Sequence, residues 1–138
     1  MGIEMVGARC TRCWLLAVML ACAAGCSTEP RQYVVKGKIT FDGQPLSDGD
    51  ILFASPAGDR GPDASRIKAG AYELKTTEGS KRVEISASKI RPGGARGAGG
   101  EPVPEEFIPE RYNTQSELTA QVQPSNANLI DFELRSQK

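Results

Sequence analysis

The 138-residue chain contains no histidine, which removes the commonest general base, the commonest metal ligand and the usual partner of a nucleophilic serine. Its 17 basic and 17 acidic residues give a formal net charge of zero, so no nucleic-acid partner is indicated. Aromatic residues make up only 6% of the chain and no internal repeat is visible, which argues against a solenoid or a propeller. We therefore expect one small domain without catalytic activity, a metal ion or another cofactor.

Cysteine is confined to the amino-terminal stretch, at Cys10, Cys13, Cys22 and Cys26. Because the remainder of the chain has none, disulfides cannot hold the folded domain together. The spacing of Cys10 and Cys13 matches half of a zinc or redox site, but the sequence offers no second half.

Residues 1–25 have the pattern of a lipoprotein signal peptide. Arg9 and Arg12 precede an apolar run at 13–24, which is too short for a permanent membrane-spanning helix. Residues 23–27, AAGCS, resemble the bacterial lipobox, and this resemblance implies that Cys26 carries a diacylglycerol and palmitate-like acyl chains. Cys22 is an alternative site of cleavage, and an ordinary cleaved signal peptide with an incidental cysteine also stays open.

The lipidated cysteine and a short polar tether are expected to occupy residues 26–32. Each buried methylene of an acyl chain contributes about 0.8 kcal/mol, so several chains hold a protein on a membrane. We expect secretion across the inner membrane and lipid anchoring in the bacterial cell envelope. Ser27 stands where some bacteria place an aspartate for inner-membrane retention, so the outer membrane is favoured.

The stretch from 34 to 53 predicts a pair of strands. Val35, Ile39 and Phe41 alternate with polar residues, and a turn around Asp42-Gly43 leads to a second strand at 50–54. Similar alternation recurs around 72–74, 81–88, 118–122 and 130–134. About seven short strands separated by turns predict an all-β, antiparallel two-sheet sandwich over residues 33–138.

The apolar members of these strands form the predicted core. At roughly 2 kcal/mol for each large buried side chain, they suffice to oppose the ordering entropy of a small domain. The set comprises Val35, Ile39, Phe41, Ile51, Phe53, Tyr72, Leu74, Val83, Ile85, Leu118, Val122, Ile130, Phe132 and Leu134.

Three groups of motifs resemble the carboxypeptidase regulatory-like domain, a transthyretin-like β-sandwich. They are GKITFDGQPL at 37–46, GAYEL at 70–74, and Gly79 followed by Val83-Glu84-Ile85. The tail resembles small bacterial lipoproteins that carry this domain, through FIPERYN at 107–113, SELT at 116–119, and Asn128 leading to DFEL at 131–134. The resemblance implies a non-catalytic accessory module, mostly of uncharacterised role.

A long flexible loop is expected at 90–116, where the strand pattern stops. Residues 91–100 have no large apolar side chain, whereas Phe107 or Ile108 should pin the later part onto the sandwich. Long loops on rigid sandwiches often carry function. We therefore predict a partner-contact loop with Arg91, Arg96, Phe107, Arg111 and Tyr112 as its candidate residues.

These observations favour an envelope-anchored binding or structural module for a protein or a glycan, with its oligomeric state open. One alternative is a carboxylate-dependent glycoside hydrolase or a calcium site that uses Glu105, Glu106 and Glu110. A solvated acidic segment explains the same three residues more simply. Another alternative is a solute-binding protein of the envelope, although one small sandwich leaves little room for a deep pocket.

Overall fold

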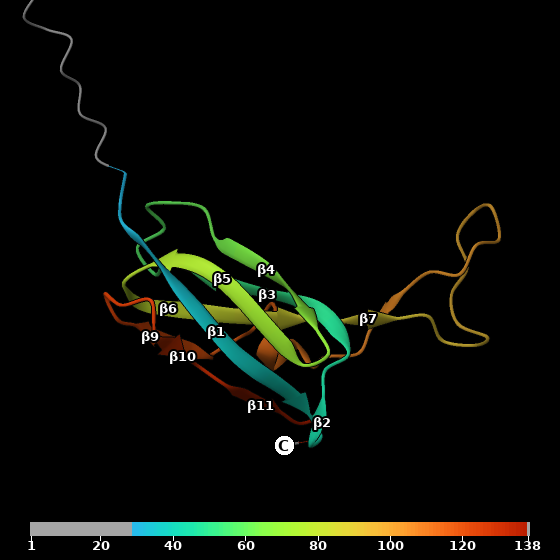
Figure 1. The fold of residues 1–138 in the computed structure, drawn as a ribbon. Coiled ribbons are helices and arrows are strands. Elements are labelled where there is room, and N and C mark those ends of the chain that lie inside the picture. The colour runs from blue at the N-terminus through green and yellow to red at the C-terminus, as the bar shows by residue number, and fades with distance from the viewer. Residues whose placement is uncertain (1–28, 138) are drawn as a thin grey trace, which may run out of the picture.

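The computed structural model describes residues 29–137, in which almost all regular structure is β-strand (Figure 1). A single 3-10 turn, η1, occupies Glu110–Tyr112. The strands are β1 (Gln32–Phe41), β2 (Gln44–Pro45), β3 (Asp48–Ala54), β4 (Asp63–Lys68), β5 (Ala71–Thr77), β6 (Gly79–Ser86), β7 (Ser88–Lys89), β8 (Glu105–Glu106), β9 (Thr119–Val122), β10 (Asn128–Leu129) and β11 (Phe132–Leu134).

The main sheet follows the order β10-β1-β5-β4-β3-β6-β9, with β2 and β11 also paired to β1. The sheet curls on itself, so that β1 and β5 pass in front of β3 and β6 (Figure 1). Phe53 of β3 meets Tyr72 of β5 across the core, with ring centroids 6.2 Å apart. The predicted all-β sandwich is confirmed.

Two pairings depart from the expected antiparallel pattern. Strand β1 runs parallel to both β10 and β11, with Val35 opposite Asn128 and Ile39 opposite Phe132. Parallel neighbours need a long crossover, and most of the domain lies between β1 and these closing strands. Alternation within a strand reports its buried face but not the direction of its neighbour, so the sequence could not reveal this pairing.

The turn predicted around Asp42-Gly43 follows β1 in the structure. Thr40 pairs with Pro45 and Phe41 with Gln44, which leaves Asp42-Gly43 as a two-residue connection. Asp42 has φ 51° and Gly43 has φ 80°, as an Asp-Gly turn of the mirror-image type requires.

The predicted core is confirmed with three adjustments. Phe41, Leu118 and Ile130 are partly buried and pack against the core, while the other predicted members are buried. The buried apolar set also contains Leu46, Ile67, Ala87, Ile108 and Ala120.

Candidate functional site

Residues 88–106, called the arm here, form an extended hairpin that projects from the sandwich (Figure 1). Strands β7 and β8 pair at its base, with Ser88 opposite Glu106 and Lys89 opposite Glu105. Further out, the Val103 N–H donates to the Ala95 carbonyl at 3.0 Å. The first part of the segment expected to be a loop at 90–116 therefore contains backbone pairing, because hydrogen bonds between its two sides need no apolar side chains. The later part contains η1.

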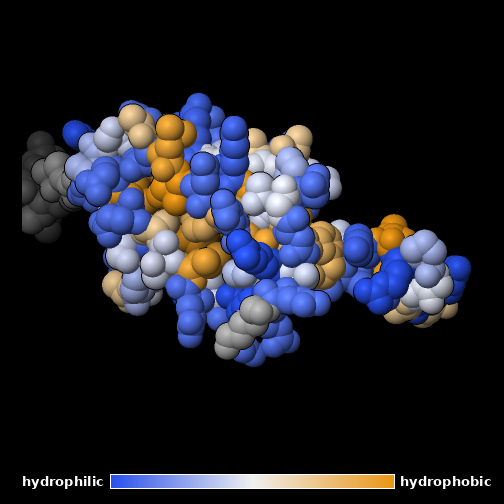
Figure 2. Space-filling model, turned by 90° about the horizontal axis from the view of Figure 1, so that it is seen from below, coloured by the Kyte–Doolittle hydropathy of each residue, from blue (hydrophilic) through white to orange (hydrophobic). Residues whose placement is uncertain are grey.

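The arm carries exposed apolar groups beside its charges. Ile90 is 60% exposed and Val103 is 39% exposed. Arg91 pairs with Glu105 at 3.3 Å, and Arg96 donates to the Gly100 carbonyl at 2.7 Å. Figure 2 shows the arm standing clear of the body, with orange apolar groups among blue hydrophilic ones.

Two aromatic and apolar side chains fix the base of the arm. Phe107 packs edge to face on Phe41 with centroids 5.6 Å apart, and the Lys89 ammonium lies 4.8 Å from the centroid of the Phe107 ring. Ile108 is buried in the core, which confirms the predicted pin. Since Phe41 is the last residue of β1, the arm joins the body near the end of β1 and far from its beginning.

A carboxylate adds a second restraint at the base. The Glu106 Oε1 atom accepts the backbone N–H groups of Ala87 and Ile108, both at 2.9 Å. Hydrogen bonds to a charged acceptor are among the stronger ones in proteins. Glu106 therefore ties the end of β6 to the segment that enters the core.

Arg111 and Tyr112 hold the carboxy-terminal residues. Arg111 donates to the carbonyls of Arg135 and Gln137, and the Tyr112 hydroxyl accepts the Arg135 N–H at 3.2 Å. Arg111 also lies over the Tyr112 ring, and its hydrogen bond to the phenol lowers the pKa of Tyr112. Both side chains are engaged in contacts within the chain.

The structure thus divides the predicted contact residues into two groups. Arg91 and Arg96 lie on the projecting arm, whereas Phe107, Arg111 and Tyr112 anchor the following segment to β1 and the carboxy-terminal residues. Sequence reasoning had treated these five residues as one loop. It did not name Ile90 and Val103 as contact residues, although the prolines on both sides of Val103 were a usable signal that this side chain lies outside a buried strand.

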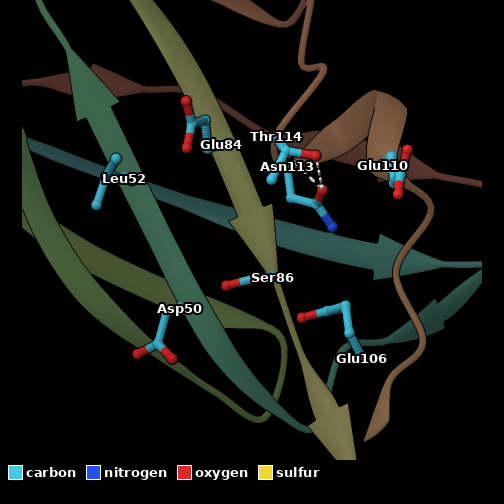
Figure 3. Close-up of a pocket in the computed structure, with 8 residues that line it drawn as sticks. All are labelled: Asp50, Leu52, Glu84, Ser86, Glu106, Glu110, Asn113 and Thr114. Atoms are coloured by element: carbon cyan, nitrogen blue, oxygen red, sulfur yellow. Dashed lines mark hydrogen bonds between the residues drawn. The ribbon is translucent and has the colours of Figure 1, made fainter.

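An acidic hollow of about 390 Å³ lies beside the arm on the outer side of β3 and β6 (Figure 3). The side chains of Asp50, Leu52, Glu84 and Ser86 come from the two strands. Glu106, Glu110, Asn113 and Thr114 form the opposite side. Of the three acids considered for catalysis, Glu106 and Glu110 reach this hollow, whereas Glu105 pairs with Arg91.

Most of these carboxylates already have partners. Glu84 pairs with Arg82, and Glu110 accepts from the Gln115 amide at 2.8 Å. In the described part of the chain, no group of three or more acidic or cysteine side chains is arranged to hold a metal ion. Among the acids of the hollow, Glu106 holds two backbone N–H groups, whereas Glu84 and Glu110 contact neighbouring side chains.

The predicted lipidation site, Cys26, and its alternative, Cys22, lie outside the described residues. Between residues 29 and 137, no helix has the length and apolar character needed to cross a membrane.

No model of a known protein family and no curated protein matches this sequence. Among solved structures, the chain is similar to a DUF3823 family protein from Parabacteroides merdae, with 15% identity and a TM-score of 0.40 over 78% of this chain and 46% of the other. It is also similar to a 9R-lipoxygenase from Cyanothece, with 12% identity and a TM-score of 0.39 over 78% of this chain and 17% of the other. The chain therefore spans less than half of each neighbour, and neither likeness assigns it a family or a function.

Proposed function

We propose that the protein is a lipoprotein of the bacterial cell envelope whose carboxypeptidase regulatory-like sandwich is a non-catalytic binding or structural module. Its partner is an envelope protein or glycan, and the arm makes the contact. The observation that carries this proposal is the arm itself, which projects from a well-packed sandwich and exposes Ile90 and Val103. Both side chains lie on the stem of the arm, between its base strands and its tip at 97–101. Covering such exposed apolar surface with a partner stabilises the complex.

The geometry of attachment supports this assignment. Strand β1 starts at Gln32, next to the tether, and ends at Phe41. Phe41 contacts Phe107 at the base of the arm, so the tether and the arm lie at opposite ends of β1. Ten residues of strand span about 30 Å. An anchor at Cys26 would therefore hold the arm away from the membrane surface, where envelope partners are within reach.

Site-specific photo-crosslinking in cells tests the arm. A photoreactive residue is placed at Val103 or Ile90, with Gln121 as an exposed control on β9. We expect a discrete crosslinked product from the two arm positions and none from position 121. Equal labelling at all three positions would remove the arm as the contact.

A shortened arm provides the matching loss-of-function test. Replacing residues 91–103 with Asn-Gly keeps the pairing of β7 with β8 and supplies a turn suited to a hairpin. The thermal unfolding midpoint should stay within a few degrees, while copurification of the crosslinked partner is lost. Retained copurification would contradict the proposal.

The anchor is tested separately by fractionation. Cys26→Ser should move the protein from the membrane fraction to the soluble envelope fraction, because the thiol that carries the lipid is absent. Cys22→Ser is the control and should leave the membrane fraction unchanged. The reverse result would place the lipid on Cys22.

A glycoside hydrolase is the alternative from another class, and the acidic hollow is the observation in its favour. Such enzymes place two carboxyl groups about 5 to 10 Å apart across the scissile bond. Glu106, however, is held by two backbone N–H groups, and Glu110 by Gln115, which supports a structural role. Hydrolysis of a glycan by the wild type that disappears in Glu110→Gln would favour the enzyme.

A further inference from the structure

A second surface, called the basic groove here, lies where β1, β5 and β4 meet on the outside of the sheet. It has a volume of about 810 Å³, and none of its lining residues belongs to the arm. Four of the lining side chains are cationic and two are acidic: Lys36, Lys38, Arg66 and Lys68 against Glu73 and Asp131. The groove thus carries a net charge of +2, unlike the chain as a whole.

Part of this positive charge is already neutralised. Lys36 pairs with Glu73 at 2.8 Å across β1 and β5. Arg66 makes two hydrogen bonds to the Asp48 carboxylate, at 3.0 and 2.9 Å, which lower the pKa of Asp48. Lys36 and Arg66 therefore contribute little to the binding of an additional anion.

Lys38 and Lys68 are different. Ala71 of β5 is directly opposite Lys38 on one side and Lys68 on the other. All three residues are exposed and line the groove. Among residues 29–137, neither lysine forms an ion pair, since no carboxylate lies within 4 Å of its ammonium.

Two carboxylates beside these lysines accept hydrogen bonds from other groups. Asp48 is opposite Lys68 in the β3–β4 pairing, but its two oxygens accept from Arg66. Asp131 accepts the backbone N–H of Lys38 at 2.6 Å. The two ammonium groups therefore remain available to a ligand.

The spacing of the two lysines suits one anionic group. Two strand spacings separate their Cα atoms by about 10 Å, and a lysine side chain extends about 6 Å. Both ammonium groups can thus reach a single phosphate or carboxylate above the small Ala71 side chain. Glu73 and Ser65 at the same groove provide oxygen atoms that hydroxyl groups can approach.

We propose that the basic groove binds an anionic glycan, with one phosphate or carboxylate group seated over Ala71 between Lys38 and Lys68. A glycan fits better than an acidic peptide, because the backbone groups of β1 and β5 are paired with each other and offer no ladder to an added strand. Lys38 also lies six residues beyond Gln32, about 20 Å along β1 from the tether. At this distance from the membrane, a glycan polymer reaches the groove more readily than lipid headgroups do. This preference for a glycan over a lipid rests on the lipid anchor proposed above.

Binding of polygalacturonate, a carboxylate glycan, to the full processed chain in neutral detergent tests the groove. Lys38→Gln and Lys68→Gln each remove one positive charge, and Lys75→Gln removes one from an exposed β5 position outside the groove. We expect about a 5-fold loss of affinity for each groove variant and less than a 2-fold loss for the control. Unchanged thermal unfolding midpoints would show that all three variants are folded.

Other outcomes would overturn the proposal. Equal losses in the three variants would indicate unspecific charge attraction, and the absence of binding to polygalacturonate would remove the glycan. Binding to polyglutamate alone, or to vesicles containing phosphatidylglycerol alone, would identify an acidic peptide or a lipid surface instead. The chain with the shortened arm separates the two proposals, because it should lose the crosslinked partner and keep its affinity for polygalacturonate.

Discussion

The Tyr72 hydroxyl donates a hydrogen bond of 2.8 Å to the Ile130 carbonyl, 58 positions later in the chain. This carbonyl lies where the closing segment passes from β10 to β11 over β1. Gly37 of β1 is directly beneath it, since a Cβ atom built there would lie 1.7 Å from the Ile130 oxygen. The absence of a side chain at Gly37 is what lets the last strands close against the first.

Gly37→Ala should therefore be strongly destabilising. The added methyl group would collide with backbone atoms of Ile130, which cannot move without breaking the pairing of β10 and β11 with β1. We expect a loss of about 3 kcal/mol in the free energy of unfolding, measured by urea denaturation. Gly61→Ala is the control, because a Cβ atom at Gly61 meets no atom within 4 Å and the change should be close to neutral.

Tyr72→Phe should remove the hydrogen bond and change the response to alkaline pH. Burial, with a smaller contribution from the Asp131 charge, raises the pKa of Tyr72 above its usual value of 10.0. The phenol therefore stabilises the folded state below pH 10, and this contribution is lost as the pH rises through the folded-state pKa. We expect Tyr72→Phe to cost about 1 kcal/mol at pH 7 and its deficit to shrink above pH 10. A constant difference across this range would contradict the assignment.

Thr76→Val should stabilise the protein. Thr76 is fully buried on β5, and its Oγ1 atom has no hydrogen-bond partner among residues 29–137. Valine has the same shape without the unpaired hydroxyl, so we expect a gain of about 1 kcal/mol in the free energy of unfolding. Thr119→Val on β9 is the exposed control. A loss of stability in Thr76→Val would show that the hydroxyl is satisfied in solution.

Glu106→Ala should loosen the base of the arm. Two backbone N–H groups, of Ala87 and Ile108, would lose their acceptor. We expect a cost of about 2 kcal/mol and faster amide hydrogen exchange at these two positions. Glu117→Ala is an exposed acidic control that should change neither quantity. Unaltered exchange at 87 and 108 in Glu106→Ala would exclude this role for the carboxylate.

Much of the fold followed from local patterns in the sequence. Alternation in the stretches around Ile39, Ile51, Val83 and Phe132 identified the buried faces, because successive side chains of a strand point to opposite sides. Asp42-Gly43 predicted the turn, and the apolar pair Phe107-Ile108 predicted that this segment is pinned to the sandwich. Such features depend on a few adjacent residues and need no knowledge of distant ones.

Other features depend on residues that only the tertiary structure brings together. The parallel pairing of β1 with β10 and β11, and the contact of Ile130 with Gly37, join the two ends of the domain. Lys38 of β1 and Lys68 of β4 lie on either side of Ala71 of β5, so no motif in the sequence predicts the basic groove. The sequence alone determined the longer strands of the main sheet and the buried side of each, since alternation is a local property. Only the folded chain decided strand direction, the division of the contact residues between arm and anchor, and the groove, because each arises from pairing between distant segments.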